Sequence, residues 1–366
     1  MKISISKGEL VNAINLVIRA TASRPSVPSL SGILIETTTG GITLYASDLE
    51  TSIKTSAVAL VEEEGVVAVG GKIFSNIIKS LPETSVVLDC QEDILHITAG
   101  QSVFDIRTIN PSDFSPFPTQ FDEENKREVS AGVLPAMIKK VSKSVSRDET
   151  RAILTGVLLS MDGPSIKMVA TDSYRLALIE KIAQKAYDTP FEVLVPGKSL
   201  EEVGRMVDES DVVKIMVSAG QILFVFGKTL FVTRRLEGKY PNYKSLIPRE
   251  WNTKATITHN EILDSARRVS LLAMNNASVK MEISTENQRI TLSSKSQDLG
   301  NAEEKIPVKV EGADNHISIN YNYLIDGLSV VESEFITFEM SEPMKPGIIR
   351  APEENFTYLV MPVAAH

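Results

Sequence analysis

The stretch SGILIETTTGGITLYASD at residues 31–48 decides the fold, because the chain repeats it. Residues 155–172 read TGVLLSMDGPSIKMVATD and carry the same opening glycine and closing aspartate, both 124 residues further along. Each stretch predicts two strands joined by a polar turn. A third, weaker copy, SVKMEISTENQRITLSSK, begins at Ser278. A repeat of about a third of the chain predicts three similar domains rather than one large core.

The segments around these copies recur in the same order. Apolar residues spaced three and four apart predict two helices per copy, at residues 7–20, 72–81, 133–146, 198–207, 260–273 and about 321–331. The rest reads as short strands rich in Val, Ile, Phe and Thr, separated by Gly, Asp and Pro. We therefore predict an α+β fold of three domains, each with two helices and antiparallel sheets, at residues 1–122, 127–248 and 252–366.

Each copy also ends alike. Phe104 and Arg107 in the first copy match Phe231 and Arg234 in the second, and Arg350 occupies the same place in the third. A charged stretch follows the first two endings, which is where we place the domain boundaries.

Charge and composition limit the functional classes. The net charge of −9 argues against nucleic-acid binding when taken alone. However, the helical segments 72–81 and 133–146 carry lysines and no acid, so we expect a locally basic surface on an acidic body. A single cysteine, Cys90, excludes an internal disulfide, and the sequence shows no secretion-like or membrane-spanning apolar run. We expect a cytoplasmic protein without a membrane partner.

No motif for catalysis, metal or cofactor binding emerges. The four histidines lack metal-ligand spacing. The segment 197–199 resembles the end of a phosphate loop, but Glu192 stands where that loop needs glycine. Asp172 has no histidine or carboxylate beside it, so a turn-capping role is expected. Two alternatives stay open: an enzyme with turnover dependent on Asp172 or His96, and a monomeric scaffold that binds only proteins.

Several motifs resemble the family of bacterial DNA sliding clamps, the beta subunits of DNA polymerase III. They are SRPSVPSLSGILIE (23–36), ATDSYRLAL (170–178), VPGKSLEEVGRM (195–206), YPNYKSLIP (240–248) and YLVMP (358–362). The resemblance implies a non-catalytic homodimer that closes a six-domain ring around duplex DNA, independently of DNA sequence and without a cofactor. It also implies that the ring tethers the replicative polymerase, the clamp loader and repair proteins through short peptide motifs.

The same resemblance implies three sets of site residues. The DNA-binding set is Arg24, Lys72, Lys139, Lys140, Lys143, Arg147 and Lys198. The dimer-interface set is Phe104, Leu271 and Leu272. The peptide-binding pocket set is Arg151, Leu154, Thr171, Tyr174, Arg175, Leu176, Pro241, Leu246, Asn320, Tyr323, Val360, Met361 and Pro362.

Within the pocket set, Leu176, Val360 and Met361 are expected to form an apolar floor. Arg175 and Asn320 are expected to hold the peptide backbone. Tyr174 and Ser245 depart from the residues common in the family, histidine and a long basic side chain respectively. The tail 363–366 is expected to cover or extend the pocket.

Overall fold

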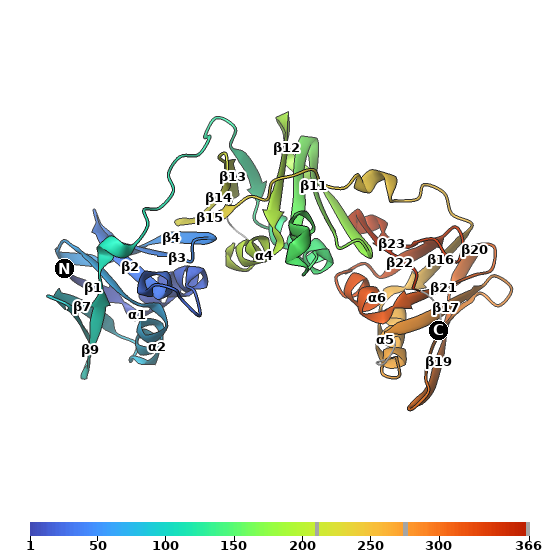
Figure 1. Ribbon diagram of the computed structural model, residues 1–366, viewed down its shortest axis with the longest axis horizontal. Coiled ribbons are helices and arrows are strands. Elements are labelled where there is room, and N and C mark those ends of the chain that lie inside the picture. Colours follow the sequence, from blue (N-terminus) through green and yellow to red (C-terminus); the bar gives the residue numbers. More distant parts are fainter. Residues whose placement is uncertain (209–211, 274–276, 364–366) are drawn as a thin grey trace. The chain divides into compact units, whose positions relative to one another are not determined.

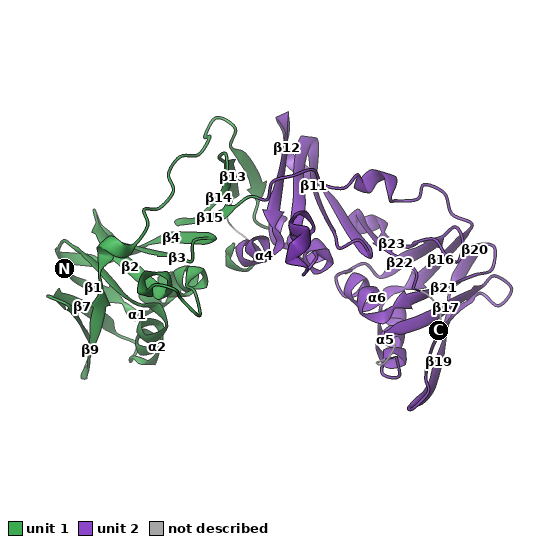
Figure 2. Ribbon diagram, viewed as in Figure 1, with its two compact units in different colours: residues 1–132, 205–235 green, residues 133–204, 236–366 purple. Residues whose placement is uncertain are grey.

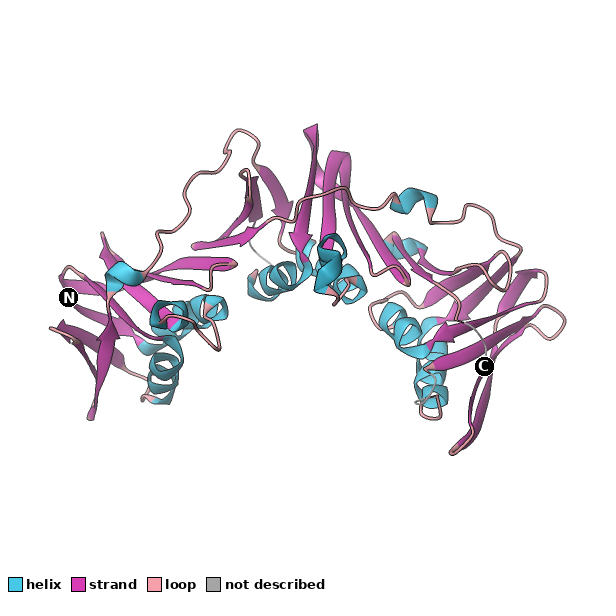
Figure 3. Ribbon diagram, viewed as in Figure 1, coloured by secondary structure: helices cyan, strands magenta, loops and turns pink. Residues whose placement is uncertain are grey.

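The structure, a computed structural model, describes residues 1–208, 212–273 and 277–363. The chain divides into two compact units, residues 1–132 with 205–235 and residues 133–204 with 236–366 (Figure 2). Helices and antiparallel strands build both units (Figure 3). The expected α+β architecture is therefore confirmed.

The described residues of the first unit form two complete α-helices and one extended sheet (Figure 1). Its helices are α1 (Lys7–Val17) and α2 (Gly71–Ser80). Its strands are β1 (Lys2–Ser6), β2 (Gly32–Thr38), β3 (Gly41–Ser47), β4 (Thr51–Val58), β5 (Leu60–Glu63), β6 (Val66–Gly70), β7 (Ser85–Gln91), β8 (Ile94–Ala99), β9 (Ser102–Ile109), β10 (Arg127–Ser130), β13 (Val212–Val217), β14 (Gln221–Phe226) and β15 (Thr229–Arg234). Their order in the sheet is β10-β13-β14-β15-β4-β3-β2-β6-β9-β8-β7-β1-β5.

The described residues of the second unit form the remaining α-helices and two sheets. The helices are α3 (Leu134–Val141), α4 (Gly197–Met206, whose last two residues fall in the first unit), α5 (His259–Ser270) and α6 (Tyr321–Leu328). The strands are β11 (Gly156–Thr171), β12 (Arg175–Pro196), β16 (Thr253–Thr258), β17 (Ser278–Ser284), β18 (Arg289–Ser296), β19 (Gly300–Pro307), β20 (Lys309–Gly312), β21 (Asn315–Asn320), β22 (Phe335–Met340), β23 (Gly347–Ala351) and β24 (Phe356–Val360). The sheet orders are β11-β12-β24-β23-β22-β16-β20 and β19-β18-β17-β21.

All six expected helices are present, with ends shifted by a few residues. Helix α1 begins where the Ser6 side chain accepts a hydrogen bond from the Glu9 amide at 3.2 Å, and it buries Leu10, Ile14 and Val17 on one face. The last turns of the expected first and third helices are 3₁₀, at 18–20 and 142–144. No helix in the described part of the chain is long and apolar enough to cross a membrane.

Two strand pairings join consecutive copies of the repeat. In the first unit β4 pairs with β15, from Thr51 opposite Thr233 to Thr55 opposite Thr229. In the second unit β12 pairs with β24, from Arg175 opposite Val360. The two pairings have the same register. Each β12 residue lies 124 positions after its equivalent in β4, and its β24 partner lies 127 positions after the equivalent in β15. The repeat therefore extends to strand register, and sheets that continue between copies explain why three repeats form two units. The domain limits drawn from the sequence stay a prediction.

A buried ion pair joins α3 to the C-terminal part of the second unit. Lys140 is 5% exposed, donates to the Val330 carbonyl at 2.8 Å and forms an ion pair with Glu354. The other Glu354 oxygen accepts bonds from the amides of Glu332 and Ser333 at 2.7 and 2.6 Å. Burial raises the pKa of Glu354, but the hydrogen bonds from Lys140 and Ser333 outweigh it and hold the pKa at about 2.

This ion pair corrects one sequence-based prediction. Lys140 was expected to contact DNA, but its ammonium group is enclosed and already satisfied by a carboxylate and a carbonyl. An ammonium in that position cannot reach a phosphate without breaking a buried charge pair, which is costly. Lys140 is therefore a structural residue of the second unit.

Replacing Lys140 with Met should destabilise the second unit by roughly 3–5 kcal/mol, because Glu354 is left buried without its cation. The readout is urea unfolding followed by fluorescence of Trp251, the one tryptophan of the chain, which lies in this unit. Lys139→Met is the matched control, since Lys139 is exposed and should cost less than about 1 kcal/mol.

The same pair gives a pH dependence. The folded pKa of Glu354 is depressed from 4.5 to about 2, so its stabilising contribution is complete above pH 4.5 and disappears as pH falls toward 2. The Glu354→Gln variant should lack this part of the acid dependence. Equal midpoints for Lys140→Met and Lys139→Met, or an unchanged acid profile in Glu354→Gln, would contradict the assignment.

Candidate functional site

The turn between β11 and β12 organises the candidate site in the second unit. One oxygen of Asp172 accepts hydrogen bonds from the backbone amides two and three residues further on, at 2.9 and 3.0 Å. Asp48 makes the same pair of bonds between β3 and β4, at 3.0 and 2.7 Å. The turn-capping role predicted for these aspartates is confirmed, and it accounts for their place in the repeat.

Arg175, the first residue of β12, forms two ion pairs and contacts an aromatic ring. It is 9% exposed, donates from Nε to Asp172 at 2.9 Å and from Nη1 to Asp326 of α6 at 2.6 Å. Its guanidinium carbon lies 4.5 Å from the centre of the Tyr323 ring. Burial alone would lower the pKa of Arg175. Tyr358 and the two carboxylates outweigh burial and raise the pKa above its usual value, so the guanidinium stays charged. Arg175 therefore positions α6 and Tyr323 through Nε and Nη1, and its contact with a peptide backbone stays a prediction.

Two tyrosines and the C-terminal segment form the exposed edge of the site. Tyr174 is 56% exposed, and its ring stacks on Tyr323 with centroids 6.3 Å apart and planes inclined by 21°. The amide of Met361 donates to the Tyr174 carbonyl at 2.8 Å, which fixes the segment after β24 beside the turn. This edge combines flat, amphipathic surface with a flexible thioether, which is suited to contacting varied side chains.

An apolar cluster lies beneath this edge. Leu176 is buried with Leu158, Val169, Leu194 and Leu359. Six partly buried side chains pack against this cluster: Ile153, Leu178, Leu236, Tyr240, Tyr243 and Ile247. A cavity of about 410 Å³ borders the cluster, lined by Lys167, Leu178, Glu180, Tyr243, Lys244, Ile247, Pro248, Arg249 and Arg350.

Strand register corrects the predicted floor. Leu176 stands opposite Leu359, whereas Val360 stands opposite Arg175. Because directly opposed residues share a face of an antiparallel pair, Val360 lies on the face of Arg175 and Leu359 joins Leu176. Sequence reasoning missed Leu178, although a residue two positions after Leu176 on a strand must share its face.

The remaining predicted pocket residues take different positions. Arg151 is exposed and bonds Asp148 at 3.0 Å and Ser173 at 3.2 Å, so it borders the turn. The buried Thr171 hydroxyl donates to the Arg175 carbonyl at 2.6 Å, and it supports the turn from below. Leu246 is 48% exposed. Arg151 and Thr171 thus border the turn at its rim and its base.

Other members of the set come from loops and from the end of the chain. Leu154 is half-buried and Pro241 is exposed. Asn320 caps α6, because its side-chain oxygen accepts a hydrogen bond from the Asn322 amide at 2.9 Å. Pro362 forms a bridge with Ile319 of β21.

The C-terminal tail and the loop before β16 complete the comparison with the predicted pocket. The Val363 amide donates to the Ser318 carbonyl at 2.9 Å, so the last described residue is attached to β21. The rest of the tail, residues 364–366, lies outside the described residues. Ser245 donates to the Asn242 carbonyl at 2.8 Å and therefore serves its own turn. In the described part of the chain no group of three or more His, Cys, Asp or Glu side chains could hold a metal ion.

Comparison with known proteins identifies the family. Models of the N-terminal, central and C-terminal domains of the DNA polymerase III beta subunit match residues 1–118, 128–242 and 244–364. The chain belongs to this family. The beta sliding clamps of Bacillus subtilis and Synechococcus elongatus are each 31% identical to it, over 100% and 99% of both chains respectively.

Solved structures agree over the whole length. The DNA polymerase sliding clamp of Bacillus subtilis matches with a TM-score of 0.95 and 31% identity, covering 100% of both chains. The DNA polymerase III beta subunit of Thermotoga maritima matches with a TM-score of 0.91 and 28% identity at the same coverage. The clamp fold that the resemblance implied is therefore confirmed.

Proposed function

We propose that two copies of this chain close a ring that encircles duplex DNA and tethers the replicative polymerase, the clamp loader and repair proteins. The chain acts as a non-catalytic processivity factor of the cytoplasm. The observation that supports this most strongly is the identical register of the β4–β15 and β12–β24 pairings, which implies a third pairing of the same kind.

The third pairing would lie between two chains. In each copy of the repeat a closing strand, β9, β15 or β24, pairs with the strand before it. Each copy also has a receiving strand, which is the second strand of a hairpin: β4 after β3, β12 after β11 and β19 after β18. β15 joins β4 and β24 joins β12, while in the described residues β9 pairs with no receiving strand and β19 pairs only with β18. Joining β9 of one chain to β19 of another, twice, closes a two-fold ring.

Side chains beside these edges support the joint. Phe104 on β9 is 38% exposed, whereas its repeat equivalent Phe231 is fully buried between strands. Leu271, at the end of α5, is 66% exposed and Leu272 is half-buried. Arg268 holds this end of α5 against β19 through two bonds of 2.6 Å to Glu304. β9 meets β6 only at Thr108 and Ile109, so the edge at Phe104 is open in the described residues. An exposed aromatic ring and an exposed leucine beside such edges are typical of an interface.

Replacing Leu271 and Leu272 together with Ala should convert the dimer to a folded monomer, because apolar contact is lost at both joints of the ring. Sedimentation should give about twice the 40.1 kDa of one chain for the wild type and that mass itself for the variant. Ile182→Ala, which removes an exposed apolar side chain on β12 of this unit, is the control. A wild-type monomer would favour the scaffold alternative.

For DNA contact we retain Arg24, Lys72, Lys139, Lys143, Arg147 and Lys198, all of which are exposed. Lys139 and Lys143 lie near acids, at 3.1 Å from Glu332 and 3.6 Å from Asp326. Lys198 is 95% exposed and only 3.9 Å from a similarly exposed Glu149. Such exposed pairs are weak and can exchange for phosphate.

Changing Lys72, Arg147 and Lys198 to Glu should reduce DNA binding by at least about tenfold and flatten its salt dependence, since each phosphate contact contributes to the slope. Lys185, Lys228 and Lys239, exposed lysines of strands and turns, give a control triple variant with the same charge change. If both variants bind DNA equally weakly, net charge alone acts and the contact set is wrong.

The site around Asp172 is proposed to capture the peptide tails of partner proteins. Leu176 and Leu359 offer the apolar floor, while Tyr174, Tyr323 and Met361 offer the edge. Arg175 and Asp326 hold this edge in place before a peptide arrives, which limits the entropy lost on binding.

Leu176→Ala combined with Met361→Ala should weaken binding of a polymerase tail peptide by about 100-fold, because floor and edge are both lost. Leu299→Ala combined with Met344→Ala is the control, since these side chains are 57% and 71% exposed elsewhere in the unit. Calorimetry on the full chain measures both. Unchanged affinity in the first variant would place the peptide elsewhere.

A further inference from the structure

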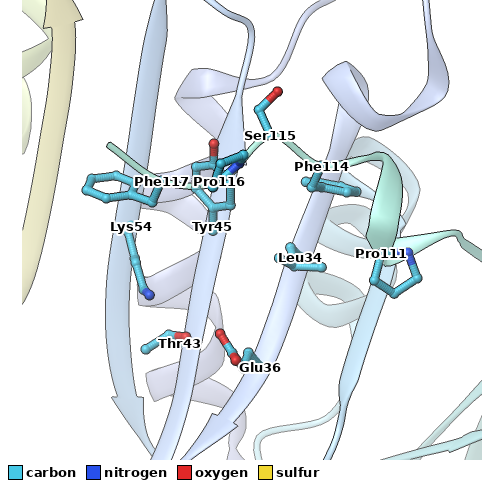
Figure 4. A pocket seen from close by; sticks show the side chains of 10 residues that line it. All are labelled: Leu34, Glu36, Thr43, Tyr45, Lys54, Pro111, Phe114, Ser115, Pro116 and Phe117. Carbon is cyan, nitrogen blue, oxygen red and sulfur yellow. The ribbon is translucent and has the colours of Figure 1, made fainter. Parts of the chain in front are cut away.

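The first unit contains a pocket that the proposed function does not use. It lies on the face of β2, β3 and β4 beneath the segment 111–117 and encloses about 180 Å³ (Figure 4). Its lining is Leu34, Glu36, Thr43, Tyr45, Lys54, Pro111, Phe114, Ser115, Pro116 and Phe117. This volume is well below the roughly 300–1,000 Å³ of a drug-sized ligand site, so it suits a single side chain.

The pocket occupies the repeat position of the apolar cluster in the second unit. Three pocket residues on β2, β3 and β4 lie 124 positions before residues of the apolar cluster, which is the offset between the repeats. Two phenylalanines of the segment 111–117 lie 126 positions before tyrosines that pack on the cluster. The pairs are Leu34 with Leu158, Tyr45 with Val169, Lys54 with Leu178, Phe114 with Tyr240 and Phe117 with Tyr243. The fold therefore builds the same cleft twice, with different side chains.

Tyr45 is the most informative of these differences. It is 5% exposed and lies between Phe114 and Phe117, with ring centroids 6.4 and 5.6 Å away in edge-on geometry (Figure 4). Its hydroxyl oxygen is buried and has no hydrogen-bond partner in the described residues. Buried hydroxyl groups are nearly always paired, so an unpaired one in a pocket wall points to an acceptor supplied by a ligand.

Charge is the second difference. Lys54 stands where the second unit has Leu178, and Glu36 stands where it has Ser160. Neither charged group forms an ion pair with the described part of the chain. An ammonium at the wall of an aromatic slot favours a ligand that carries a carboxylate beside its apolar group.

We propose that this pocket binds a short extended peptide segment in which an aromatic side chain stands next to an aspartate or glutamate. The aromatic ring enters the pocket against Leu34 and Phe114, the Tyr45 hydroxyl donates to a peptide carbonyl, and Lys54 pairs with the carboxylate. The inference rests on the proposed function only in expecting protein partners; the cavity, the unpaired hydroxyl and the ammonium are independent of it.

The test uses the full chain and a fluorescein-labelled hexapeptide with one phenylalanine followed by one aspartate among glycines, measured by anisotropy. Tyr45→Phe removes only the hydroxyl and should weaken binding about fivefold at an unchanged melting temperature. Lys54→Met keeps the aliphatic stem and should weaken it about tenfold. A probe with asparagine in place of aspartate should bind wild type and Lys54→Met equally.

The Leu176→Ala, Met361→Ala variant separates this site from the one in the second unit. Unchanged affinity of the probe there, with losses in both first-unit variants, supports the inference even if polymerase tail peptides fail to bind anywhere. If the probe binds more weakly to that variant but with unchanged affinity to Tyr45→Phe and Lys54→Met, the inference is overturned and the proposed function stays intact. Absence of saturable binding at millimolar chain concentration also overturns it.

Discussion

Strand pairing between successive copies of the repeat is the constraint on which the rest of the structure depends. The β4–β15 and β12–β24 ladders have the same register, so each copy ends in a strand that completes the sheet of its predecessor. A chain of three copies satisfies two such pairings. In the described residues it leaves a closing strand, β9, that meets β6 only at Thr108 and Ile109, and a receiving strand, β19, that pairs only with β18. Exposed strand edges invite pairing, and a second copy of the chain offers the matching edge.

Local chemistry keeps the copies alike at the points that fix this pairing. Asp48 and Asp172 hold equivalent turns with equivalent hydrogen bonds. The helices that follow, α2 and α4, begin at Gly71 and Gly197, where an added Cβ would lie 3.0 and 3.1 Å from a backbone carbonyl in each case. A side chain at either position would crowd the carbonyl of the residue that precedes β2 or β11, which favours glycine in both copies.

The sequence predicted what is local or periodic. Helix positions follow from apolar spacing, and the role of Asp172 follows from its turn. The sequence could not reveal that Lys140 is buried, because its partner Glu354 lies 214 residues away and a lysine in an acid-free helix looks like a surface charge. The bond between Arg175 and Asp326 was hidden for the same reason, since the two residues are 151 positions apart in the sequence. Register, not composition, placed Val360 on the face of Arg175.

Divergence between equivalent clefts shows how one scaffold acquires different sites. The cluster around Leu176 is aliphatic, whereas its counterpart has Tyr45 and Lys54 on the same framework. The most direct measurement of the whole account is retention of the wild-type chain on nicked circular DNA, before and after linearisation, at a salt concentration that suppresses direct binding. A closed ring should remain on the circle and leave the linear form through its ends. Equal retention on both forms would contradict encirclement.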